Sequence, residues 1–175
     1  MKRISLIIIA MLLSFAAFAQ KMDTDFSQTR VMKVSGKTST MEGHITFNGG
    51  DQLSMMYSNP KGDYFIVDGN QVKMNLLGKK AQMDAENNKQ VKLQKSTLLN
   101  CLSGKFEQAA EDNNAELTTT EEKGCRTIRI QAKGKVPKGG YSFIEMTFSL
   151  PSESLTKLVL EENTSGGIMN TYELR

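Results

Sequence analysis

Apolar and polar residues alternate along most of the chain, and this period of two constrains the fold more than any other feature. In the segment 41–47, for example, Met41, Gly43, Ile45 and Phe47 share one side, and the residues between them are polar. Because successive side chains of a strand point to opposite faces, such alternation predicts an antiparallel sheet with one apolar and one solvated face. The same pattern recurs in the segments 53–57, 72–76, 128–130, 144–150 and 158–160.

Turn-forming residues separate the alternating segments, as in Asn48-Gly49-Gly50-Asp51 and Asp68-Gly69-Asn70. Glycine, asparagine, aspartate and proline are the residues that tight connections between strands favour. The two signals together predict a mainly β fold. Its expected strands are about 25–34, 38–47, 53–58, 63–68, 71–77, 80–84, 114–120, 125–133, 141–150, 154–162 and 168–174.

One segment departs from this period and predicts a helix over about residues 94–111. Its apolar residues Leu98, Leu102, Phe106 and Ala109 follow one another at steps of four, four and three, which places them on one helical face. A single helical segment cannot cover so much half-apolar sheet. The sheet must therefore curl, or leave apolar surface open.

The ends of this helix are less clear. Ser96 or Thr97 would suit the N-cap position. Gly104 is unfavourable inside a helix by about 1 kcal/mol relative to alanine, so two shorter helices are an alternative.

Residues 1–19 have the three-part layout of a secretory signal peptide. Lys2 and Arg3 precede an apolar stretch, and Ala17-Phe18-Ala19 provides a cleavage site before Gln20. The apolar stretch is shorter than the ~20 residues that a membrane-spanning helix needs. We therefore expect cleavage of this segment and a single domain over residues 20–175, exported to the periplasm and not integral to a membrane.

The charge balance argues against a nucleic-acid partner. The chain contains 22 Lys and Arg against 19 Asp and Glu, and removal of Lys2 and Arg3 with the signal peptide leaves 20 against 19. Nucleic-acid-binding domains carry a marked basic excess.

Motifs for catalysis or for cofactor binding do not occur in the sequence. There is no G-x-S-x-G, H-E-x-x-H, C-x-x-C or phosphate-loop pattern. The single histidine, His44, stands on the polar side of its segment, and we expect it to be solvated. Asp23 and Asp25 share one face, and we expect them to act as solubilising charge. The sequence thus predicts neither an enzyme nor a bound cofactor or metal.

The sulfur-containing residues leave two questions open. Cys101 and Cys125 could form one disulfide in an exported protein, or could be two buried thiols. Eight of the nine methionines beyond residue 20 fall in predicted strands. Because methionine is flexible and polarizable, they could fill an ordinary core or line an apolar cavity that accepts varied partners.

Three successive segments resemble the periplasmic outer-membrane lipoprotein carrier family, LolA. They are Gly43-His44-Ile45-Thr46-Phe47, Leu53-Ser54-Met55-Met56-Tyr57-Ser58-Asn59-Pro60 and Tyr64-Phe65-Ile66-Val67-Asp68-Gly69. Phe26-Ser27-Gln28 is similar to the phenylalanine-x-glutamine of the family's first strand. The tail, with Leu158-Val159-Leu160 and Met169-Asn170-Thr171-Tyr172-Glu173-Leu174, is similar to its closing hairpin.

The resemblance implies a strongly curved antiparallel sheet, an incomplete barrel, with a helical lid over an apolar cavity. It implies a carrier or chaperone that shields the acyl chains of lipoproteins or lipids, taken from an inner-membrane release complex and passed to an outer-membrane acceptor. The alternative is an envelope lipid-binding or sensing module of the same fold without transfer activity. On alternation and helical spacing, we expect the cavity to be lined by Ile45, Phe47, Leu53, Met55, Tyr57, Val72, Met74, Leu98, Leu102 and Phe106.

The chain departs from the family pattern at two places. Gly49-Gly50 stands where the family commonly has an Arg-Pro pair, whose arginine is tied to lid closure and cargo handling. Once the signal peptide is removed, only a few residues from Gln20 onward precede Phe26, too few for the amphipathic helix with which family members begin. We therefore expect the 94–111 segment to form nearly the whole lid.

Overall fold

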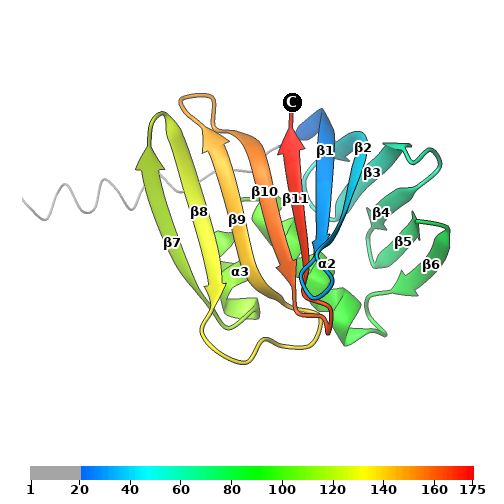
Figure 1. Ribbon diagram of the computed structural model, residues 1–175. Coiled ribbons are helices and arrows are strands. Elements are labelled where there is room, and N and C mark those ends of the chain that lie inside the picture. The colour runs from blue at the N-terminus through cyan, green and yellow to red at the C-terminus, as the bar shows by residue number, and fades with distance from the viewer. Residues whose placement is uncertain (1–20) are drawn as a thin grey trace, which may run out of the picture.

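A single antiparallel sheet of eleven strands, together with two helices, makes up the computed structural model, which describes residues 21–175 (Figure 1). The strands follow the order β6-β5-β4-β3-β2-β1-β11-β10-β9-β8-β7. Their bounds are β1 Met22–Met32, β2 Lys37–Phe47, β3 Gln52–Asn59, β4 Tyr64–Asp68, β5 Gln71–Leu76, β6 Lys79–Asp84, β7 Ala115–Glu122, β8 Cys125–Ala132, β9 Tyr141–Ser149, β10 Ser154–Glu162 and β11 Ile168–Leu174. The signal peptide expected over residues 1–19, with its expected cleavage before Gln20, lies outside the described residues.

The first and last strands pair in the middle of the sheet, where Phe26 of β1 lies opposite Leu174 of β11. Every other neighbouring pair consists of strands consecutive in the sequence. The edge strands β6 and β7 do not pair with each other, so the sheet stays unclosed. Figure 1 shows it curved around the helices. The mainly β fold and the curved, open antiparallel sheet expected from the sequence are confirmed.

The helical segment consists of α2 (Lys89–Leu102) and α3 (Phe106–Asp112). The chain breaks at Gly104, whose φ of 74° is favourable for glycine and strained for other residues, so the alternative of two helices is correct. The expected start was wrong. Asn88 is the N-cap, and its side-chain oxygen accepts hydrogen bonds from the backbone N–H of Gln90 and Val91.

One buried asparagine connects both helices to the sheet. The Asn113 side-chain amide donates to the Thr97 hydroxyl in α2 and to the Ala109 carbonyl in α3, at 2.8 Å each. Its oxygen accepts from the backbone N–H of Tyr141 in β9 at 2.9 Å. Asn113 and Thr97 are fully buried. The helices are therefore anchored to the β9 half of the sheet by polar contacts as well as by packing.

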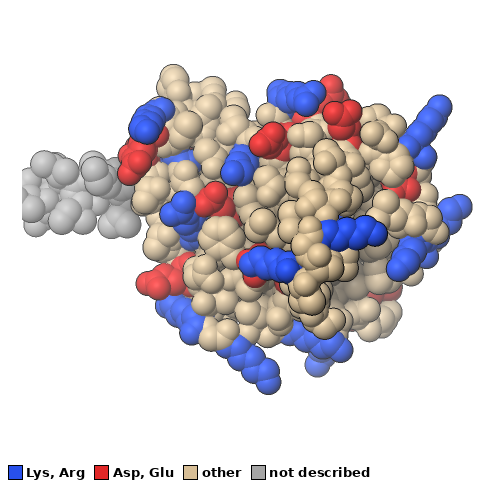
Figure 2. Space-filling view, viewed as in Figure 1, with Lys and Arg blue, Asp and Glu red and all other residues tan. Residues whose placement is uncertain are grey.

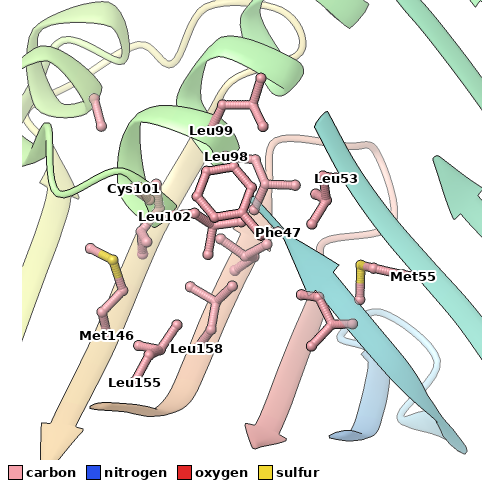
Figure 3. Packing of buried hydrophobic residues seen from close by; sticks show 14 of the residues in the cluster. Phe47, Leu53, Met55, Leu98, Leu99, Cys101, Leu102, Met146, Leu155 and Leu158 are labelled. Carbon is pink, nitrogen blue, oxygen red and sulfur yellow. The ribbon is translucent and has the colours of Figure 1, made fainter. Parts of the chain in front are cut away.

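The hydrophobic core lies between the concave face and the helices (Figure 3). Its fully buried members include Phe47, Leu53, Ile144 and Met146. The Cys101 and Cys125 thiols are both free, so the structure has two thiols and no bridge between them. Among residues 21–175, no helix combines the length and the apolar character that crossing a membrane requires.

Candidate functional site

An apolar cavity of about 720 Å³ lies between the concave face of the sheet and helix α2. This volume falls in the range of small-molecule binding sites. From α2, Gln94, Leu98 and Leu102 line it at helical spacing. The rest of the lining comes from the strands and, at Leu77, from the turn between β5 and β6. It consists of Met22, Phe26, Gln28, Arg30, Met32, Lys37, Ser39, Met41, Ile45, Leu53, Met55, Tyr57, Phe65, Met74, Leu76, Leu77, Lys79, Tyr141, Leu155, Leu158, Leu160, Glu162, Asn170, Tyr172 and Leu174.

The residues expected to line a cavity divide into two groups. Seven of them line it: Ile45, Leu53, Met55, Tyr57, Met74, Leu98 and Leu102. The other three, Phe47, Val72 and Phe106, are buried in the core and do not line it. The Phe106 ring packs against the Phe148 ring, with 6.0 Å between centroids. Val72 lies opposite Val67 and Met83 on neighbouring strands, and Figure 3 shows Phe47 beside Leu98 and Leu102.

Side chains of β1, β10 and β11 also line the cavity, although none of them was among the residues expected there. They include Phe26, Leu158 and Leu160, whose positions follow the same alternation. The proximity of β10 and β11 to β2 and β3 depends on the pairing of β1 with β11, more than a hundred residues apart in the sequence. Alternation shows which face a residue is on, but it does not show which strands are neighbours.

A chain of hydrogen-bonded polar side chains crosses this mainly apolar lining. The Tyr57 hydroxyl donates to Gln28 Oε1 at 2.7 Å, and the Gln28 amide donates to Asn170 Oδ1 at 2.9 Å. The Asn170 amide in turn donates to Glu162 Oε1 at 2.9 Å. Gln28, Tyr57 and Asn170 are buried. Each of these groups meets its hydrogen-bonding needs from a neighbour, as buried polar groups must.

Burial also shifts the pKa values of two members of this polar chain, Tyr57 and Glu162. Loss of solvent raises the pKa of Tyr57 to about 12. Burial likewise raises the pKa of Glu162, although the nearby Arg30 and the hydrogen bond from Asn170 act in the opposite direction. The Tyr57 hydroxyl therefore remains a neutral hydrogen-bond donor at physiological pH.

The solvent exposure of the lining side chains differs from one part of the cavity to another, and the exposed ones mark its mouth. Ile45, Leu53 and Leu158 are buried at its floor. Four lining residues are exposed and surround the opening: Met32, Lys37, Leu77 and Lys79. Figure 2 shows Lys and Arg interspersed with Asp and Glu over the face in view. The mouth thus combines basic and apolar side chains.

Five methionines line the cavity: Met22, Met32, Met41, Met55 and Met74. The sequence left two interpretations of the methionine-rich strands, a filled core or a cavity lining. These five positions agree with a cavity lining, whereas Met146 is part of the filled core. Unbranched thioether side chains change rotamer readily and fill irregular spaces. The lining can therefore adapt to apolar ligands of different shape.

His44 lies on the opposite, convex face and is held by two carboxylates. Its Nδ1 is 2.8 Å from Asp25 Oδ1, and its Nε2 is 2.6 Å from Asp23 Oδ1. The hydrogen bond with Asp25, followed by that with Asp23, raises the pKa of His44 above 6.5. All three side chains are exposed, as expected from the sequence, and the register places His44 directly opposite Asp25.

Comparison with known proteins adds a family match. The family model described as outer membrane lipoprotein carrier protein LolA matches residues 18–171. No curated protein matches the sequence. Among solved structures, a LolA superfamily protein of Nitrosomonas europaea aligns with a TM-score of 0.41 at 8% identity, over 90% of this chain and 84% of that chain. The lipoprotein LppX of Mycobacterium tuberculosis aligns with a TM-score of 0.35 at 14% identity, over 100% of this chain and 95% of that one.

Proposed function

The chain belongs to the outer membrane lipoprotein carrier family, and from this premise we propose that it is a periplasmic binding protein that shields acyl chains of lipoproteins or lipids. The observation that carries the proposal is the apolar cavity of about 720 Å³ between the sheet and α2. An acyl chain in water is costly, and each buried CH₂ contributes about 0.8 kcal/mol to binding. Binding alone accounts for the site, so we propose no enzymatic activity.

We propose that this protein also releases its ligand, acting as a carrier with α2 as a lid. A fully enclosed sixteen-carbon chain would gain roughly 12 kcal/mol by the same measure, and several such chains would be held too tightly to leave. Leu98 and Leu102 on α2 are buried against the cavity. They can compete with the ligand for the same apolar surface and so weaken its binding. Partners in transfer would be an inner-membrane release complex and an outer-membrane acceptor.

A second candidate function is an envelope lipid-binding or sensing module without transfer. One observation favours it. Gly49 and Gly50 occupy the turn between β2 and β3, with φ of 88° and 65°, in place of the family's Arg-Pro pair. The two candidates differ in whether bound cargo moves to outer-membrane vesicles, which a carrier delivers and a sensing module retains.

Two neighbouring methionines on opposite faces of β3 provide the test of ligand binding. Met55 lines the cavity and is buried, whereas Met56 is exposed on the other face. We expect Met55→Asp to weaken saturable binding of a fluorescent fatty acid by at least about tenfold, because an unpaired carboxylate in an apolar site resists desolvation. Met56→Asp introduces the same charge on the same strand and should bind as the wild type does.

Folding of the variants must be checked alongside, by circular dichroism. Because Met55 is buried, Met74→Asp serves as a second variant: Met74 also lines the cavity but is only partly buried. Equal binding by the wild type and both cavity variants would show that the probe binds elsewhere. A wild type without any saturable binding would show that the cavity takes no acyl ligand.

A further inference from the structure

Arg30 is a basic residue of the cavity lining near Tyr57 and Glu162 of the polar chain. It lies on β1 opposite Asn170 of β11 and Ser39 of β2, and it lines the cavity. Within residues 21–175 its guanidinium makes no ion pair and no side-chain hydrogen bond, although it lies near enough to Glu162 to lower the pKa of that carboxyl. A half-buried guanidinium with five donors is suited to a carboxylate or phosphate group.

The charged residues of the lining are mostly basic. Within the described lining, the basic residues are Arg30, Lys37 and Lys79, and the one acidic residue is Glu162. Glu162 already accepts a hydrogen bond from Asn170. Since the chain as a whole is almost balanced in charge, this local excess distinguishes the cavity from the rest of the molecule.

The basic residues and the apolar floor occupy different parts of the cavity. Lys37 and Lys79 are exposed at the mouth, Arg30 is half-buried, and Leu53 and Leu158 are buried. A ligand whose acyl chain enters the cavity first would place that acyl chain among the leucines and methionines and its polar headgroup beside Arg30. The cavity thus has the polarity of an amphiphile with a negative headgroup.

We propose that the ligand is an amphiphile with an anionic headgroup, a phosphate or carboxylate joined to acyl chains, and that Arg30 binds the headgroup. This inference rests on the proposed function, because it assigns a substrate class to the same cavity. Lys37 and Lys79 attract the headgroup at the mouth, and Arg30 supplies the charge-assisted hydrogen bonds that hold it. Glu162 on β10 lies near Arg30, and the negative charge of its carboxylate limits the affinity of this site for the anionic headgroup.

The test compares two fluorescent phospholipids with the same acyl chains, phosphatidylglycerol and phosphatidylcholine. We expect the wild type to prefer the anionic phosphatidylglycerol, and Arg30→Gln to weaken its binding about tenfold, which corresponds to about 1.4 kcal/mol. Binding of phosphatidylcholine should change little. Arg129→Gln is the matched control, since Arg129 lies on β8, exposed and paired with Glu145 away from the cavity.

Two further measurements separate this role from others. If Arg30 serves only to balance Glu162, Arg30→Gln will lower thermal stability without altering the preference between lipids, and adding Glu162→Gln will restore that stability. That result would overturn the proposal. Inorganic phosphate should not displace phosphatidylglycerol, and displacement would instead indicate a site for free anions.

The outcomes also distinguish this inference from the proposed function. Equal binding of both phospholipids, unchanged by Arg30→Gln, would reject the anionic headgroup and leave the acyl-binding cavity standing. Binding of neither phospholipid, nor of the fatty acid, would reject the cavity as a lipid site altogether.

Discussion

Gly43 lies on β2 between two neighbouring strands and against one aromatic ring. It lies opposite Phe26 on β1 and Tyr57 on β3. A side-chain carbon at position 43 would lie 2.5 Å from the Met56 carbonyl oxygen and 2.8 Å from the Phe26 ring. The Phe26 ring meets the Tyr57 ring edge-on at 5.3 Å between centroids. Absence of a side chain at Gly43 therefore allows the aromatic packing beside the polar chain of the cavity.

We expect Gly43→Ala to lower the free energy of unfolding by about 1–3 kcal/mol, the usual cost of overpacking. The nearest obstacle is a backbone atom, which cannot move aside as a side chain can. Denaturant unfolding measures the difference. Gly134→Ala is the control, because a side-chain carbon there would meet nothing within 4 Å. Equal stability of the two variants would show that the β2–β3 contact is looser than described.

At the scale of the elements, the strands could be predicted closely, whereas the start of the helical segment could not. Each of the eleven strands lies within a few residues of its expected range, because alternation and turn residues mark both ends of a half-buried strand. Helix α2 begins five residues earlier than expected, at Lys89. Its first turns are almost wholly polar, with Val91 as their buried residue, and so carry little apolar periodicity.

The candidate site was predictable in part for a similar reason. Residues such as Met55 and Leu98 could be assigned to the apolar face from spacing alone. Phe47 and Phe106 share that face, but they pack where the helices already fill the space. Periodicity shows the direction of a side chain and carries no information on whether another element covers it.

Asn113 links three elements, and its removal should be costly. We expect Asn113→Ala to lower the free energy of unfolding by about 3 kcal/mol, because it leaves the Thr97 hydroxyl and the Tyr141 N–H buried without their partner. Thermal or urea unfolding is the measurement. Asn87→Ala removes an exposed amide that bonds Asp84 and should change stability by no more than about 0.5 kcal/mol. A similar small effect at both positions would contradict the anchoring role of Asn113.

For the molecule as a whole, the cavity follows from the mismatch between a long sheet and little helix. The sheet has eleven strands, whereas α2 and α3 comprise 14 and 7 residues. Helix α3 packs against β7 and β8, where Ile128 and Ile130 are fully buried. Of these two helices only α2 lines the cavity, which occupies the concave side of β1 to β6 and of β9 to β11.

The most direct test of an acyl-binding cavity is mass spectrometry of lipids extracted from the protein purified from its native envelope. Acylated molecules should accompany the wild type in stoichiometric amount, should be lost from Met55→Asp, and should be retained by Met56→Asp. The two variants differ only in which face of β3 carries the charge, so the comparison isolates the cavity. A wild type that carries no acylated molecule, or lipid that persists equally in both variants, would contradict the account.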